Sequence, residues 1–198
     1  ITPNWNEEEE LHAALTFALR EYCRDTGFDE VVLGISGGVD SSLCAALAAE
    51  ALGPQNVLGV TLPSRHSSAA TRSDAELASR NLGLEFAEMP IEGLYSTALD
   101  QFTDWKTIKN NVTRENFQAR LRGLLLMGIS NETGRMVIAT GNKTELGLGY
   151  CTLYGDMVGG MLLIGDVNKI QVYRVAEYLN SRADEELSSI PVLMVTAE

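Results

Sequence analysis

The stretch VVLGISGGVDSS, residues 31–42, decides the fold of this 198-residue chain. It begins with apolar, β-branched residues, which predict a buried strand, and the alanine-rich residues 43–52 that follow predict a helix. Gly37 and Gly38 lie between the two, and glycine lets a backbone turn tightly and approach a ligand closely. Such a turn leaves unpaired N–H groups at the start of a helix, where anions bind.

Two common phosphate-binding patterns do not fit this turn. The P-loop requires a lysine directly after its last glycine, and no lysine follows Gly38. The dinucleotide pattern G-x-G-x-x-G has a different spacing. What is present is S-G-G-x-D-S, residues 36–41, followed by Ser42. Its serines offer hydroxyl donors, and the Asp40 carboxylate can hold a divalent cation beside phosphate groups.

Composition narrows the class of protein. The length suits one domain, residues 1–198, with a real core, and 45% hydrophobic residues with mean hydropathy near zero indicate a globular protein. No apolar run approaches membrane-spanning length, and no signal peptide is expected. Three widely spaced cysteines favour a reduced, cytoplasmic protein. With 27 acidic and 15 basic residues the net charge is −12, which argues against nucleic-acid binding and favours a small-molecule substrate.

Apolar periodicity predicts alternating strands and helices. We expect strands at residues 30–35, 56–62, 84–90, 135–140 and 161–164. We expect helices at residues 6–22, 43–52, 73–82, 113–129 and 170–180, with a weaker helical pattern at 94–109. This alternation predicts an α/β fold: an open, mostly parallel five-stranded sheet, Rossmann-like, with helices on both faces. Ligands of such sheets bind at the carboxyl ends of the strands, so the segments that follow the strands should converge there.

Four later segments narrow the interpretation further. They are NFQARLRG at residues 116–123, ATGNKTE at 139–145, GYCTLYGD at 149–156, and Lys169. Together with the glycine turn, and in this order, they resemble the synthetase domain of the NAD synthetases, which belong to the ATP pyrophosphatase superfamily. The similarity is to the bacterial glutamine-dependent branch and covers most of the chain.

The resemblance implies an ATP-dependent ligase. It would adenylate the nicotinate carboxylate of deamido-NAD with ATP and Mg²⁺, release pyrophosphate, and amidate the product with ammonia to give NAD and AMP. Because phosphate charge develops in these steps, electrostatic stabilisation should outweigh acid–base work by side chains. Two alternatives stay open: another amidating synthetase with the same loop, such as a GMP-synthetase-like domain, and an ATP-binding module without catalysis.

The resemblance also implies roles for individual residues. Asp40 and Lys169 take catalytic positions, and Asp40 and Glu145 are the expected Mg²⁺ ligands. Substrate contacts are assigned to Asn116, Arg120 and Glu145, of which the first two lie four apart on one helix face. The residues that would bind the ATP cofactor are Ser36, Gly37, Gly38, Val39, Ser41, Ser42 and Thr140.

Some positions depart from the family pattern. Leu153 replaces a lysine that ammonia-dependent relatives carry before Tyr-Gly-Asp, which favours the glutamine-dependent branch. That branch adds a glutaminase domain, a possible partner for which this chain has no room. The C-terminal segment after the last helix is expected to be incomplete, with Thr196 or Glu198 as its remnant. A homodimer is implied as well, with residues 159–164 compatible with its interface.

Overall fold

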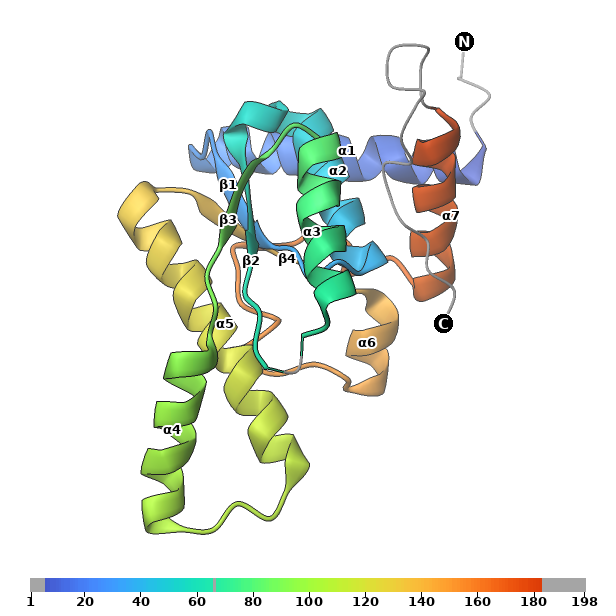
Figure 1. Ribbon diagram of the computed structural model, residues 1–198. Helices are drawn as coiled ribbons and strands as arrows, with labels where there is room; N and C mark the ends of the chain where they lie inside the picture. Colours follow the sequence, from blue (N-terminus) through green and yellow to red (C-terminus); the bar gives the residue numbers. More distant parts are fainter. Residues whose placement is uncertain (1–5, 66, 183–198) are drawn as a thin grey trace.

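The sheet is the centre of the computed structural model, which describes residues 6–65 and 67–182. Its five strands run in the order β3-β2-β1-β4-β5, and every neighbouring pair is parallel. The strands are β1 (Val31–Gly34), β2 (Val57–Thr61), β3 (Glu85–Glu88), β4 (Met136–Ala139) and β5 (Met161–Leu162). The predicted open parallel sheet is confirmed, and β1 lies at its middle (Figure 1).

Helices connect the strands and cover both faces of the sheet. They are α1 (Glu7–Thr26), α2 (Val39–Leu52), α3 (Ala69–Asn81), α4 (Glu92–Trp105), α5 (Asn111–Thr133), α6 (Lys143–Leu148) and α7 (Lys169–Ser181), with a short 3₁₀ turn η1 (Pro54–Asn56). The part of the chain that the structure describes contains no helix long and apolar enough to cross a membrane.

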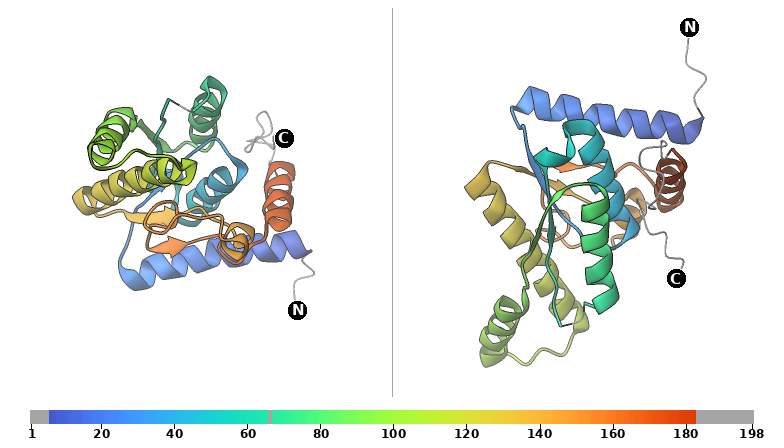
Figure 2. Two further views of the ribbon diagram at one scale, coloured as in Figure 1. Left: turned by 90° about the horizontal axis from the view of Figure 1, so that it is seen from below. Right: turned by 45° about the horizontal axis from the view of Figure 1, so that its top comes forward.

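Alternate residues of β1 point to different cores. Val31 and Leu33 lie with α1, α2 and α7 in one fully buried cluster. Val32 lies in the other, against Leu126 of α5. This alternation is the period-two geometry of a strand that is covered on both faces. Figure 2 shows the corresponding layers, with α5 on the opposite side of the sheet from α2.

Several element boundaries differ from the prediction. Helix α2 begins at Val39 rather than at residue 43, because Gly38 occupies the N-cap position and the following Asp and Ser residues already take helical geometry. Helix α6 was not predicted at all. Its N-cap Asn142 and Glu145 form a capping box, and this N-x-x-E spacing is a signal for a helix start that the sequence carries. The unclear segment 94–109 is helical as far as Trp105.

The glycine- and aromatic-rich stretch after α6 carries two exposed tyrosines. Aromatic side chains are usually core, yet Tyr150 and Tyr154 are 80% and 83% exposed. Within residues 159–164, Leu163 and Ile164 lie in the buried core, whereas Gly159 and Gly160 are exposed, so the expected part of this segment in a dimer interface stays a prediction. Thr196 and Glu198, the expected remnant of a C-terminal segment, lie outside the described residues.

Truncation of a β1 side chain tests how much the central strand contributes to stability. Leu33 is fully buried, so we expect Leu33→Ala to lower the free energy of unfolding by about 2–5 kcal/mol, through lost transfer energy and a residual cavity. The matched control is Leu124→Ala on α5, where the side chain is 63% exposed and the change should stay within about 0.5 kcal/mol. Urea unfolding monitored by circular dichroism measures both, and equal losses would contradict the assignment of the core.

Candidate functional site

The glycine turn between β1 and α2 is built by its own serines. Ser41 and Ser42 are almost fully buried, and each hydroxyl donates to the carbonyl of Gly38 at 3.0 Å. The Ser41 hydroxyl also accepts from the Ser36 N–H at 3.2 Å. These bonds fix the turn and leave the first N–H groups of α2 directed at its open side, as at any helix N-terminus. Val39 packs its side chain into the core, so only its backbone faces this side.

Gly37 brings helix α3 against the same turn. Its φ of 85° lies in the left-handed region, and a Cβ at this position would overlap the backbone carbonyl oxygen of Thr71. Any residue other than glycine is therefore disfavoured at this position for two reasons: its backbone would be strained at this φ, and its Cβ would overlap Thr71. The contact places the first turn of α3 directly beside the turn that begins α2.

Asp40 joins three separate segments of the chain. Its Oδ1 accepts from the Asn142 side-chain amide at 3.0 Å, and its Oδ2 forms an ion pair with the Lys169 ammonium. Lys169 is the first residue of α7, and its ammonium lies 5.2 Å from the centre of the Tyr173 ring. The structure thus brings together the two predicted catalytic residues, although they are 129 positions apart.

Asn142 also connects Asp40 to the second predicted metal ligand. Its side-chain oxygen accepts from the Glu145 N–H at 3.0 Å, and its own N–H donates to the Glu145 carboxylate at 3.0 Å. Asn142 is 1% exposed, so these bonds are shielded from water. Sequence reasoning passed over Asn142, although its place in the capping-box pattern was a usable signal.

The residues present fit a hard divalent cation that binds together with phosphate. Asp40 and Glu145 line one small cavity of about 150 Å³. Among the described residues no three or more His, Cys, Asp or Glu side chains gather in a metal-binding group. Mg²⁺ characteristically uses one or two carboxylates and completes its shell with phosphate and water oxygens. Two carboxylates beside the glycine turn at the start of α2 match the protein part of that donor set.

A larger cavity of about 400 Å³ lies over the carboxyl ends of β1, β2 and β4. Its walls are largely apolar and include Ile35, Leu62 and Leu126. It shares Ser36, Thr140 and Asp156 with the small cavity, so the two spaces adjoin at the glycine turn. An elongated ligand with an apolar end and an anionic end can therefore occupy both.

The two residues predicted on the long helix occupy a different position from the cavities. Asn116 accepts from the Thr152 hydroxyl at 2.9 Å, and Arg120 donates to the Leu153 carbonyl at 3.1 Å. Both therefore hold the loop that follows α6. In that loop the Thr152 N–H donates to Asp156 at 2.7 Å, which orients Asp156 where the cavities meet. Their predicted contact with substrate stays a prediction.

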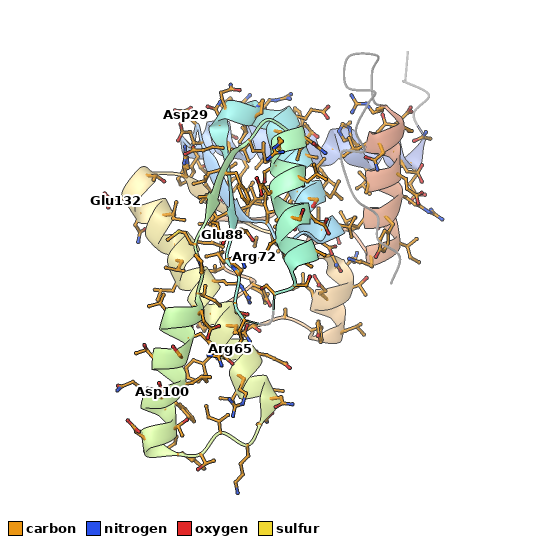
Figure 3. The ribbon with its side chains drawn as sticks, viewed as in Figure 1. Asp29, Arg65, Arg72, Glu88, Asp100 and Glu132 are labelled. Atoms are coloured by element: carbon orange, nitrogen blue, oxygen red, sulfur yellow. The ribbon has the colours of Figure 1, made fainter. Side chains whose placement is uncertain are left out.

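Two arginines of the larger cavity were missed by sequence reasoning. Arg122 was given no role of its own within the segment 116–123, but it lines the cavity and its Nε donates to the Leu62 carbonyl at 3.0 Å. Burial lowers the pKa of its guanidinium from the ordinary value. Arg72 of α3 lines the cavity as well and pairs with Glu88 at the end of β3 (Figure 3). Neither placement has a local sequence signal, because each depends on how a helix packs on the sheet.

A parallel sheet with a serine–glycine turn at its central strand defines a doubly wound α/β protein with a ligand site at the carboxyl edge. The sequence profile of the NAD synthase family matches residues 11–196, and the chain belongs to this family. The glutamine-dependent NAD(+) synthetase of Thermotoga maritima is 45% identical over 188 residues, which is 94% of this chain and 33% of that protein.

Solved structures agree with this assignment. The glutamine-dependent NAD⁺ synthetase from Acinetobacter baumannii, in complex with ADP, superposes with a TM-score of 0.91 at 39% identity, covering 98% of this chain and 36% of that one. The NH₃-dependent NAD synthetase from Campylobacter jejuni gives 0.80 at 34% identity, covering 90% and 76%. This chain thus spans about a third of the length of its glutamine-dependent relatives.

Substitution of Gly37 tests the close contact with α3. We expect Gly37→Ala to lower the free energy of unfolding by about 2 kcal/mol or more, because left-handed strain adds to the overlap with Thr71. The control is Gly27→Ala, which has a similar φ of 77° but open space around the new Cβ, so only about 1 kcal/mol is expected. Chemical denaturation measures the free energy of unfolding of both variants. Losses of equal size would show that the overlap with Thr71 adds no destabilisation.

Proposed function

We propose that this chain is an NAD-forming ligase domain that activates the nicotinate carboxylate of deamido-NAD with ATP and then amidates it with ammonia. The observation that carries the proposal is the pair of adjoining cavities. One is largely apolar and has a volume of about 400 Å³, and the other contains Asp40 and Glu145 beside the start of α2. Family membership and the ADP complex of the Acinetobacter relative support the same assignment.

In this proposal the nucleotide lies across both cavities. The base occupies the apolar space next to Leu62 and Ile138, and the phosphates lie at the turn of Gly37 and Gly38. There the N–H groups at the start of α2 stabilise negative charge without any reorganisation. Ser36 is exposed and adds a hydroxyl, and Thr140 faces the junction of the two cavities.

The charge that moves during the reaction is balanced by three side chains, those of Asp40, Lys169 and Glu145. A carboxylate oxygen of nicotinate bonds to the α-phosphorus, and the bond from that phosphorus to the bridging oxygen breaks as pyrophosphate leaves. Lys169 holds a positive charge at this end of the site and is kept in place by Asp40. Mg²⁺, held by Asp40 and Glu145, would neutralise phosphate charge when bound.

The second step forms the amide. The lone pair of ammonia attacks the activated carbonyl carbon, the bond to the AMP oxygen breaks, and the nitrogen loses one proton to solvent. Among the described residues, His12 lies on α1 with Glu50 of α2 and lines neither of the two cavities. Because both steps move charge on phosphate groups, we expect positioning and electrostatics to supply most of the rate enhancement.

The nitrogen source and the partners belong to the same proposal. The similarity to glutamine-dependent relatives, together with Leu153, favours ammonia released by a glutaminase domain. Asn116 and Arg120 would contact deamido-NAD from a homodimer interface. The free thiols of Cys23, Cys44 and Cys151 favour a cytoplasmic location. We propose that residues 1–198 belong to one synthetase unit.

The direct test supplies ATP, Mg²⁺ and deamido-NAD, with ammonium or glutamine as nitrogen source. With ammonium we expect pyrophosphate and NAD to form in equal amounts. A coupled phosphate assay measures the pyrophosphate, and mass spectrometry measures the NAD. ATP binding without pyrophosphate release would instead indicate a non-catalytic module. Release only with a purine substrate would indicate the GMP-synthetase-like alternative.

Asp40→Asn tests the central carboxylate. We expect pyrophosphate release to fall by about 100-fold or more, because a charge used in the transition state is lost while the shape of the side chain is kept. Asp29→Asn is the matched control. Figure 3 shows Asp29 at the opposite end of the sheet, and it is exposed, so activity should not change. An Asp40→Asn variant with normal turnover and an unchanged melting temperature would remove Asp40 from the mechanism.

A further inference from the structure

Arg72 is placed beside the phosphate-binding turn by the packing of α3. The backbone of Thr71 rests against Gly37, and Arg72 is the next residue of the same helical turn. Thr71 and Arg72 both line the larger cavity. Arg72 therefore belongs to the cavity wall that is formed by α3, the helix whose first turn touches Gly37, although no motif in the sequence marks it.

The partner of this guanidinium is a carboxylate on the neighbouring strand. Arg72 forms an ion pair with Glu88, the last residue of β3, and Figure 3 shows the two labelled residues next to each other. The two side chains are 44% and 41% exposed. A pair with this much contact with water is weak, because solvent screens the charges and each group can be solvated on its own.

Two other cations, one on the wall of the larger cavity and one paired with Asp40 of the small cavity, are more firmly held. Arg122 is largely buried and donates its Nε to the Leu62 carbonyl. Lys169 is paired with Asp40, which is itself 19% exposed. Arg72 thus combines a position on the cavity wall with a weak partner, so it is the cation best able to exchange one anion for another.

We propose that Arg72 binds the phosphate chain of the nucleotide, and that it exchanges the Glu88 carboxylate for phosphate oxygens when the nucleotide enters. The inference rests on the proposed function in that it assumes ATP occupies this site. A guanidinium presents a planar fork of donors that matches phosphate as well as carboxylate. Glu88 loses a partner in the exchange, but its exposure lets water replace that partner at little cost.

Charge balance supports this role. The chain carries a net charge of −12 and would have to bind a polyanionic nucleotide, so a local cation is needed to offset repulsion. In the free protein Glu88 keeps the Arg72 charge neutralised. Glu88 and the nucleotide are then competitors for one guanidinium, and removal of Glu88 should favour the nucleotide.

Binding measurements by isothermal titration calorimetry test the proposal without requiring turnover. With Arg72→Ala we expect the Kd for ATP to rise about tenfold, the loss typical of a charged hydrogen bond. The Kd for adenosine, which has no phosphate, should stay the same. With Glu88→Gln we expect the Kd for ATP to fall by about twofold, because the competing anion is gone.

The same helix offers a matched pair of controls. Arg80 and Glu76 of α3 form an exposed ion pair at spacing i,i+4, and neither residue lines a cavity described above. Arg80→Ala and Glu76→Gln should leave both dissociation constants unchanged. Melting temperatures of the Arg72, Glu88, Arg80 and Glu76 variants show whether the fold around α3 is kept. Replacement of Arg72 by lysine instead of alanine (Arg72→Lys) should restore part of the ATP affinity.

Three outcomes would overturn the inference. The first is an Arg72→Ala variant that binds ATP normally. The second is equal weakening for ATP and adenosine, which would mean that Arg72 only shapes the cavity. The third is a Glu88→Gln variant that weakens ATP binding, which would make the ion pair a structural brace. If ATP affinity responds as expected but no NAD forms, the proposed function fails while this inference stands.

Discussion

The burial of β1 between two strands and two helical layers is the constraint on which the rest of the structure depends. Its backbone is paired with β2 and β4, and its side chains fill a core on each face. The pairing continues past the strand, since the Ile35 N–H donates to the Val60 carbonyl at 2.8 Å. The chain therefore leaves the sheet in a fixed direction, and only a sharp turn through glycine returns it as α2 over the core.

That fixed direction determines the electrostatics of the site. The start of α2 is held against the carboxyl ends of β2 and β4, so groups that follow those strands come within reach of it. Asp40 is the point where they meet, because Asn142 arrives after β4 and Lys169 at the start of α7. One carboxylate thus aligns an amide and an ammonium from segments that are distant in the sequence. Each group is positioned before any ligand binds, which reduces the reorganisation that catalysis would require.

Much of this arrangement could be predicted from the sequence. Short apolar runs located the strands, helical patterns located most helices, and the rule for parallel sheets brought residue 40 and residues 140–145 to one edge. The predicted start of α2 was wrong by four residues, because Asp and Ser after a glycine are as common in loops as in the first turn of a helix. Arg72 and Arg122 escaped prediction because their placement depends on packing between α3, α5 and β2. Local patterns contain no information on such contacts.

Asn142 has two roles at once: its side chain caps its own helix, and it donates a hydrogen bond to a carboxylate of another segment. At the starts of α1, α3 and α7 the N-cap residue, Asn6, Ser68 or Asn168, accepts a bond from its own helix. Asn, Ser and Asp are nearly interchangeable at such positions. At the start of α6 this freedom is lost, since the amide must also donate to Asp40. An aspartate there would cap the helix and repel its neighbour, and a serine is too short for both bonds. Natural variation at this one cap should therefore be far narrower than at the caps of α1, α3 and α7.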